Sequence, residues 1–323
     1  TRWVEYVEKG SRIAYLLAIV LLVNRQPVNW RSAWLTLAAL FLLLYYSELN
    51  GAGKLTLEFA QNVAENLSKR GISVTADTFV FELPENGIYM LELPDRHDSA
   101  KNTAKNISVS EFKGISSEIV SFEIPDGVSM SIYDGKQDTS ELAKLQIKFE
   151  DFGIQYTNAL YAGQTDSDDG VSQSISELPG KQKQRLDDFV NALNSDGTFG
   201  YRIISLENRG FYVAAEICQT AGNTDITGMT LKICISAEDS DIMSASGKWI
   251  TFPVSSKYTD SLTDGINVIY KLDLDNVSAV NSERIVYSAR NVRENIMYLA
   301  PVWEISYTDA DSVETVTFVD AIN

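Results

Sequence analysis

The first fifty residues hold two uninterrupted apolar runs, whereas the rest of the chain alternates apolar and polar positions. Residues 33–46 carry no charge, Trp30 and Trp34 stand at one end of this run, and two tyrosines stand at the other. Aromatic residues at both ends are typical of the two membrane interfaces, and a span needs about 20 apolar residues. We therefore predict a transmembrane helix over residues 30–48. A buried core helix is the alternative, but a run that is apolar on every face fits lipid better.

A second apolar run, residues 13–23, is shorter than a typical span. It could be a short membrane span or an interfacial helix. Pro27 separates the two runs, and Arg25 and Arg31 lie between them. By the positive-inside bias, this connector belongs in the cytoplasm. With one span or with two, everything after Glu48 is then outside the cytoplasm, so we expect a cell-membrane protein with an extracytoplasmic C-terminal domain.

The start of the chain allows two interpretations. The residues after the long apolar run are Tyr-Tyr-Ser-Glu-Leu, which lack a small-x-small cleavage pattern, so we expect an uncleaved anchor. The chain does not open with Met, and Val28 is a candidate alternative start. In that case residues 1–27 are an N-terminal extension that does not belong to the native protein.

The next part of the chain predicts one helix followed by strands. Phe59, Val63 and Leu67 recur at spacing four, which predicts an amphipathic helix that ends near Gly71. A polar stretch through Lys105 could hold a short helix. Alternating segments predict strands at 72–74 and 88–93, and a hairpin formed by 118–124 and 128–133.

The same order, a helix and then strands, occurs a second time. Residues 163–180 are rich in Gly, Ser and Asp, and we assign 156–180 to a linker or loop. Leu186, Phe189 and Leu193 predict a helix over 181–194. Strand-like runs follow at 201–206, 211–218, 229–235, 249–254, 285–287, 299–307 and 313–319. We therefore predict an α+β fold in which an N-terminal transmembrane helix, or two, precedes two tandem helix-plus-antiparallel-sheet modules, residues 55–155 and 181–323.

Charge and composition exclude several classes of function. Lys and Arg total 27 against 44 Asp and Glu, a net charge of −17, which argues against a nucleic-acid partner. Five basic and three acidic residues precede residue 50, so the remaining 274 residues carry −19. Two Cys and one His also exclude zinc fingers and multi-disulfide scaffolds. An acidic extracytoplasmic domain is expected to avoid nonspecific adhesion to an anionic cell envelope. Affinity for a partner must therefore come from specific surfaces or from the membrane helix.

The chemical motifs are weak. Residues 50–56 contain Gly-Lys but lack the earlier Gly and the following Ser or Thr of a phosphate loop. The acidic run at 166–170 departs from the spacing of a calcium loop, so an acidic turn is the better interpretation. Asp273 and Asp275 fit a solvated edge, and His97 fits a polar surface loop. We therefore expect no catalytic residue, no cofactor and no metal site, and we interpret the protein as not an enzyme.

Cys218 and Cys234 lie eight residues on either side of residue 226. A hairpin folding there would place them opposite each other, and cross-strand cysteines outside the cytoplasm can be oxidised. Both also lie in apolar runs, where free Cys behaves as a small core residue. A disulfide and a pair of buried thiols both remain open.

Two parts of the chain resemble a known family. Residues 28–31 (Val-Asn-Trp-Arg), the apolar helix, the amphipathic helix over 58–70 and the Glu-Leu-Pro at 82–84 resemble the start of YycI-type regulatory proteins. In those proteins a short Asn-Trp or Asp-Trp leader opens a single membrane helix. At the other end, residues 299–305 and 319–323, with Pro301, Trp303 and Asp320, resemble the last hairpin of YycH and YycI proteins and, more loosely, of PepSY modules.

This resemblance implies a membrane-anchored accessory protein of the WalK (YycG) sensor histidine kinase in low-GC Gram-positive bacteria. Its partners would be that kinase and a YycH-type protein, and its output would be tuned cell-wall metabolism. The family is non-enzymatic, with an ectodomain of tandem α+β modules and a membrane helix that takes part in contacting the kinase. The run at 13–23 and the long acidic middle section depart from the family pattern.

The residues themselves are compatible with the same class of mechanism. An anchored ectodomain can regulate a partner by binding two of its states unequally. One face of the predicted span is a candidate helix contact, with lipid contact as the alternative; it consists of Trp34, Leu37, Phe41 and Leu44. We expect Pro301 and Trp303 to have a role in folding ahead of any role in binding. The alternative function is a PepSY-like extracytoplasmic protein that binds a ligand or restrains a peptidase.

Overall fold

The computed structural model describes residues 57–80, 87–92, 96–136, 140–164, 172–194, 197–259, 262, 265–293 and 296–322. Both apolar runs of the N-terminal segment, and with them the predicted contact face of Trp34, Leu37, Phe41 and Leu44, lie outside these residues. In the part of the chain that is described, no helix has the length and hydrophobicity to cross a membrane. The chain divides into two compact units, residues 1–63 and residues 64–323, and their boundary falls within the helix at Leu57–Ser68.

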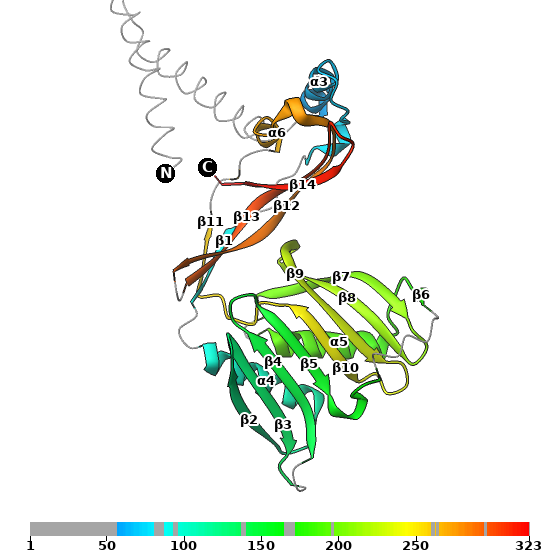
Figure 1. The fold of residues 1–323 in the computed structure, drawn as a ribbon, viewed down its shortest axis with the longest axis vertical. Helices are drawn as coiled ribbons and strands as arrows, with labels where there is room; N and C mark the ends of the chain where they lie inside the picture. Colours follow the sequence, from blue (N-terminus) through cyan, green and yellow to red (C-terminus); the bar gives the residue numbers. More distant parts are fainter. Residues whose placement is uncertain are drawn as a thin grey trace, which may run out of the picture. The chain divides into compact units, whose positions relative to one another are not determined.

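The described residues form an α+β fold with a large, mostly antiparallel sheet (Figure 1). Its α-helices are α3 (Leu57–Ser68), α4 (Arg96–Glu111), α5 (Gly180–Leu193) and the short α6 (Gly265–Ile269), and its 3-10 turns are η1 (Ala76–Thr78), η2 (Ala159–Tyr161) and η3 (Leu274–Asn276). These helices confirm the two predicted from apolar spacing at 59–67 and 181–194.

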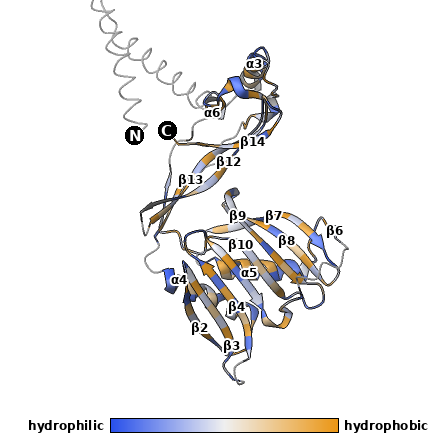
Figure 2. Ribbon diagram, viewed as in Figure 1, coloured by the Kyte–Doolittle hydropathy of each residue, from blue (hydrophilic) through white to orange (hydrophobic). Residues whose placement is uncertain are grey.

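Nine consecutive strands form what we term the large sheet, in the order β2-β3-β4-β5-β10-β9-β8-β7-β6 with antiparallel pairing throughout. Their bounds are β2 (Ser117–Ile124), β3 (Gly127–Asp134), β4 (Glu141–Lys148), β5 (Gly153–Asn158), β6 (Gln173–Ser174), β7 (Phe199–Asn208), β8 (Tyr212–Ala221), β9 (Thr224–Ser236) and β10 (Ile242–Lys248). Figure 2 shows hydrophobic and hydrophilic residues alternating along these strands, as expected when the two faces of a sheet differ.

The remaining strands form the small sheet. They are β1 (Gly87–Glu92), β11 (Ser256–Thr259), β12 (Val277–Arg293), β13 (Ile296–Asp309) and β14 (Glu314–Asp320). β13 pairs with β12 along one edge and, along the other, first with β1 and then with β14. A parallel pairing of Tyr287 with Ile226 joins the small sheet to the large one.

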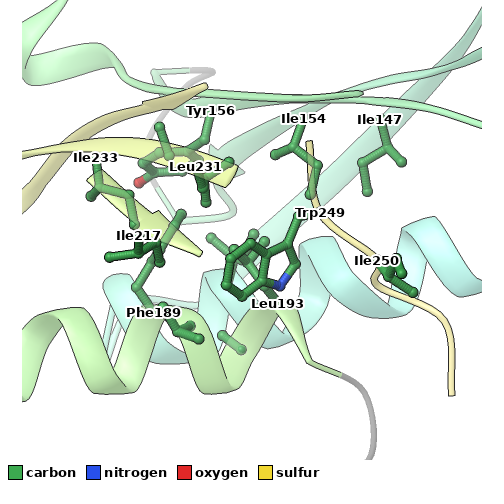
Figure 3. Close-up of a cluster of buried hydrophobic side chains, with 14 of the residues drawn as sticks. Ile147, Ile154, Tyr156, Phe189, Leu193, Ile217, Leu231, Ile233, Trp249 and Ile250 are labelled. Atoms are coloured by element: carbon green, nitrogen blue, oxygen red, sulfur yellow. The ribbon is translucent and has the colours of Figure 1, made fainter. Parts of the chain in front are cut away.

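Helices α4 and α5 cover one face of the large sheet, and the core lies between these layers (Figure 1). Figure 3 shows Trp249 at the centre of this core, beside Phe189 and Leu193 of α5. Its indole Nε1 donates to Asn194 Oδ1 at 3.0 Å, and Asn194 Nδ2 donates to the Phe199 carbonyl at 2.8 Å. Because each buried polar group has a partner, the indole can be fully buried at little cost.

Helix α4 is longer than its sequence predicts. Its buried side has helical spacing but only one large apolar residue, Ile107; the others are Ala100, Thr103, Ala104 and Ser108. The periodic signal is therefore weak, although the small side chains allow α4 to pack closely against its neighbours. His97, expected in a surface loop, lies instead in the first turn of α4, with its ring edge-on to Phe149 at a centroid distance of 5.1 Å.

The predicted hairpin at 118–124 and 128–133 is confirmed as β2 and β3, with Asp126 in the turn at φ +56°. The predicted strand at 249–254 is wrong, because this segment is irregular. In place of a strand partner, the side chain of Gln219 bonds the backbone of Ile250 twice: Nε2 donates to the carbonyl at 2.8 Å, and the Ile250 N–H donates to Oε1 at 2.9 Å. Apolar residues can be buried here without the hydrogen bonds of a neighbouring strand, because the side-chain amide of Gln219 bonds the backbone of Ile250 instead.

Strands from both sides of the predicted linker, 156–180, pair with one another. β5 lies next to β10, and β1 lies between β11 and β13. The structure therefore does not keep residues 55–155 and 181–323 as two separate sheets. Pairing between segments so distant in sequence leaves no local periodic signal. From the sequence alone, the repeated order of a helix followed by strands therefore predicts two modules.

Candidate functional site

The C-terminal hairpin β13–β14 contains the family-like residues Pro301, Trp303 and Asp320 and is a candidate functional surface. One face of the small sheet carries the cross-strand row Arg284, Glu304 and Phe318. The opposite face carries the row Ile285, Trp303 and Val319. Trp303 is fully buried, so this second face belongs to the core, whereas Phe318 on the first face is 49% exposed among the described residues.

Pro301 is buried at the point where β13 changes neighbours, after the pairs with β1 and before those with β14. Its carbonyl accepts from the N–H of Ala321 at 3.3 Å, so it points toward the β14 side. In a strand, the nitrogen and the carbonyl of one residue point to the same side, so the missing N–H of proline removes no bond to β12. Pro301 and Trp303 are therefore buried residues of β13.

β14 presents exposed apolar side chains. Val316 is 50% and Phe318 is 49% exposed, and both lie on one face together with Glu314 and Asp320. Val313, which precedes the strand, is 55% exposed. We term these five residues the β14 surface. β14 pairs with β13 along one edge, and among the described residues no strand pairs with its other edge.

The hairpin is strongly acidic. Residues 296–322 contain no Lys, Arg or His, and their five carboxylates are Glu304, Asp309, Asp311, Glu314 and Asp320. Asp320 forms an ion pair with Arg290 of β12, whose hydrogen bond lowers the pKa of that carboxyl. The Ser306 hydroxyl donates to Glu314 at 2.9 Å. A partner at this surface therefore meets apolar side chains flanked by negative charge.

Beside the hairpin, alternating charges form a chain across four strands. We term it the surface network: Arg202 on β7, Asp225 on β9, Arg284 on β12 and Glu304 on β13. Arg202 Nη2 and Arg284 Nη1 lie 2.5 and 3.1 Å from the same oxygen of Asp225, and Arg284 Nε lies 2.6 Å from Glu304. Both arginine side chains are 52% exposed, so water competes for their guanidinium groups, while Asp225 and Glu304 are 12% and 18% exposed.

A second group of charges lies inside the α4–α5 layer, and we term it the Arg185 cluster: Glu111, Arg185 and Asp241. Arg185 Nη2 lies 3.0 Å from Glu111 and 3.2 Å from Asp241, and Nη1 donates to the Ser110 carbonyl at 3.3 Å. The Glu111 side chain is 1% exposed. One arginine therefore joins the end of α4 to α5 and to the turn before β10.

Burial sets the electrostatics of this cluster. Desolvation raises the pKa of Glu111 to about 7, with Arg185 opposing the rise. The hydroxyl of Tyr156 is buried nearby without a hydrogen-bond partner among the described residues, and burial raises its pKa well above the ordinary value. Tyr161 donates to Asp239 at 3.1 Å, and burial raises its pKa to about 12.

The two cysteines are buried and free. The hairpin that would place them opposite each other does not form about residue 226, because the turn between β8 and β9 lies at 222–223. Cys218 faces Thr230 and Cys234 faces Ala214, so the thiols are not cross-strand neighbours. Burial raises the pKa of both, as expected of thiols packed in a core.

Sequence reasoning found part of this arrangement and missed part. Pro301, Trp303 and Asp320 were chosen from the family-like motif, and the structure brings them together in one hairpin. The exposure of Val316 and Phe318 was missed, although the alternation of 313–319 predicted their strand. Glu111 and Arg185 were also missed, since nothing in the sequence connects residues that far apart. No group of three or more potential metal-ligating side chains occurs in the described ranges.

Comparison with known proteins gives a limited result. No protein-family model matches the chain, and no curated protein matches it. Among solved structures, an uncharacterized protein from Eubacterium rectale shows a TM-score of 0.42 at 5% identity, over 75% of this chain and 84% of that one. The Bacillus megaterium YpeB C-terminal domain shows a TM-score of 0.33 at 16% identity, over 72% and 95%. Similarities of this size do not assign a function.

Proposed function

We propose that this protein is a membrane-anchored, non-enzymatic regulator of a sensor histidine kinase that controls cell-wall metabolism, and that it acts by protein contact. The observation that carries the contact is the exposed apolar pair Val316 and Phe318, each about half exposed on an edge strand. Soluble proteins rarely leave adjacent large apolar side chains on an open strand edge without a partner.

The kinase itself comes from resemblance to YycI- and YycH-type proteins. The similar residues are the leader at 28–31 and the hairpin segments 299–305 and 319–323. The exposed pair lies in the same hairpin, directly before the segment 319–323, so the proposed contact surface adjoins the family-like segments. A YycH-type protein is the second proposed partner.

The predicted membrane helix, residues 30–48, completes this proposal. It anchors the extracytoplasmic part and offers Trp34, Leu37, Phe41 and Leu44 to a helix of the kinase. Regulation follows if the anchor and the β14 surface bind two states of the kinase with different affinity, because a ligand shifts an equilibrium by its differential affinity.

Copurification tests the proposal. We expect the detergent-solubilised full chain to retain a sensor histidine kinase, and Phe318→Asp to weaken that retention. Leu160→Asp is the matched control, because Leu160 is also an exposed apolar residue, at 73%, but lies on η2. Recovery of a peptidase without a kinase would contradict the proposal and favour the PepSY-like alternative.

Replacing residues 30–48 by an unrelated apolar helix is the sharper test of the membrane contact. We expect kinase output in cells to change while the protein remains in the membrane. Unchanged output would remove the helix contact from the proposal and leave the ectodomain as the contact.

A further inference from the structure

Among the described residues, no strand pairs with the second edge of β14, and an isolated bridge from Leu262 to Ile322 lies just past its end. The hydrogen bonds at the two ends of β14 show which backbone groups point to this edge. The N–H of Ala321 donates to Pro301, and the carbonyl of Val313 accepts from Asp309. The backbone N–H and carbonyl groups of odd-numbered residues therefore point toward β13. Because these groups alternate in direction along a strand, those of Val316 and Phe318 point toward the opposite edge. Their side chains also point away from the core, so one row of residues offers both hydrogen bonds and apolar contact.

Apart from the charges of Glu314 and Asp320 at its ends, this edge lacks the usual devices by which proteins protect a free strand. Residues 314–320 contain no Pro and no Lys. The seven pairs from Val302–Asp320 to Thr308–Glu314 run without a register shift, whereas the pairing of β12 with β13 shifts three times. A regular edge with exposed apolar side chains is suited to the addition of another strand.

Charge identifies the kind of strand. A second copy of this chain, paired antiparallel about Thr317, would place Glu314 opposite Asp320, and like charges directly opposite are unfavourable. The hairpin contributes five carboxylates and no basic residue, and two of the five, Glu304 and Asp320, are paired with arginines of β12. The Asp320 side chain remains 61% exposed beside Arg290, so it can accept a further donor. A basic partner fits this edge, and an acidic copy does not.

We propose that β14 binds an extended segment of a partner protein that adds to the small sheet as an antiparallel strand. Opposite Glu314 and Asp320 the segment carries Lys or Arg, and opposite Val316 and Phe318 it carries apolar residues. The pattern is basic-x-apolar-x-apolar-x-basic over seven residues, or about 20 Å of strand. This inference rests on the proposed function, because it specifies the chemistry of the partner at the same surface.

A peptide titration tests the inference. The probe is fluorescently labelled Lys-Thr-Val-Thr-Val-Thr-Lys, and the control peptide has the same composition in an order that breaks the alternation. Binding is measured by anisotropy against the full chain in detergent, and hydrogen exchange is measured at 314–320. We expect saturable binding of the probe alone, with slowed exchange in β14.

Variants then separate backbone pairing from charge attraction. Val316→Pro removes an outward N–H but no bond to β13, so the hairpin should remain folded while probe affinity falls at least tenfold. Phe318→Asp should lower affinity similarly, and Leu160→Asp should not change it. Near-ultraviolet circular dichroism of each variant checks that the fold is retained.

Three results would overturn the inference. They are no binding of the probe, equal binding of the control peptide, or equal binding to the Val316→Pro variant. Dimerisation of the full chain that depends on Val316 would also overturn it, since a second copy would then occupy the edge. If a kinase copurifies while the probe fails, strand addition alone is lost. If the probe binds while no kinase copurifies, strand addition stands and the kinase assignment is lost.

Discussion

The Arg185 cluster and the surface network use the same chemistry in different surroundings. In each, one arginine joins two carboxylates. The Arg185 side chain is 20% exposed and its partner Glu111 is 1% exposed. Arg284 is 52% exposed, and its partners Asp225 and Glu304 are 12% and 18% exposed. Buried charges that lose a partner are costly, whereas exposed pairs contribute little. Equal geometry therefore does not mean equal contribution to stability.

The first prediction, and the largest effect, concerns Arg185→Ala. This change leaves Glu111 buried without its partner, so we expect it to lower the free energy of unfolding by about 3 kcal/mol at pH 8. The loss should be smaller at pH 5, where Glu111 is protonated. Urea unfolding of the full chain, followed by tryptophan fluorescence, measures both values. A loss that does not depend on pH would show that the carboxylate is not the cause.

The second prediction concerns the pH dependence that Glu111 creates. Its pKa in the folded protein is about 7, against an ordinary value of 4.5. Between these values the folded state holds a proton that the unfolded state has released, so stability falls as pH rises. Glu111→Gln removes this contribution. We expect the difference in unfolding free energy between variant and parent to rise from pH 5 to pH 7, and parallel profiles would contradict the assignment.

The third prediction tests the exposed half of the comparison. Arg284→Ala and Glu304→Ala, combined in a double-mutant cycle, should give a coupling energy below about 1 kcal/mol. High salt should reduce that coupling further, since salt screens exposed charges. The effect of Arg185→Ala should persist in the same salt. A coupling as large as the loss for Arg185→Ala would remove the distinction between the two groups.

The smallest expected effect is that of Arg290→Ala. Arg290 lowers the pKa of Asp320, whose side chain is 61% exposed. The variant should raise that pKa toward 3.8, the ordinary value for Asp. The stability that the ion pair contributes is present above that value and is lost as pH falls through the pKa of Asp320 in the folded protein. The parent and the Arg290→Ala variant should therefore have equal unfolding free energies in acid. NMR titration of the carboxyl carbon measures the shift.

Local patterns predicted local structure well. Apolar residues at helical spacing predicted α3 and α5, and alternation around Pro125 predicted the β2–β3 hairpin. Where side chains replace backbone partners, the same reasoning failed, as with Gln219 and residues 249–254. Small-residue packing hid most of α4 for a related reason, because its buried side is only weakly apolar.

The candidate site divides in the same way. Pro301 and Trp303 stood out because they are unusual residues in a strand-like run. The exposure of Phe318 and the pairing of Glu111 with Arg185 depend on which distant segments become neighbours, 74 residues apart in the second case. Periodicity reports which face of an element is apolar, but it does not report whether another element will cover that face.

The position of β1 has a consequence for biosynthesis. Tyr89 pairs with Leu299, a strand partner made 210 residues later. At about 5 to 20 residues per second, β1 waits on the order of 10 to 40 s after its own synthesis before that neighbour exists. The small sheet therefore closes only when the chain is nearly complete. Until then β1 must avoid pairing with other strands.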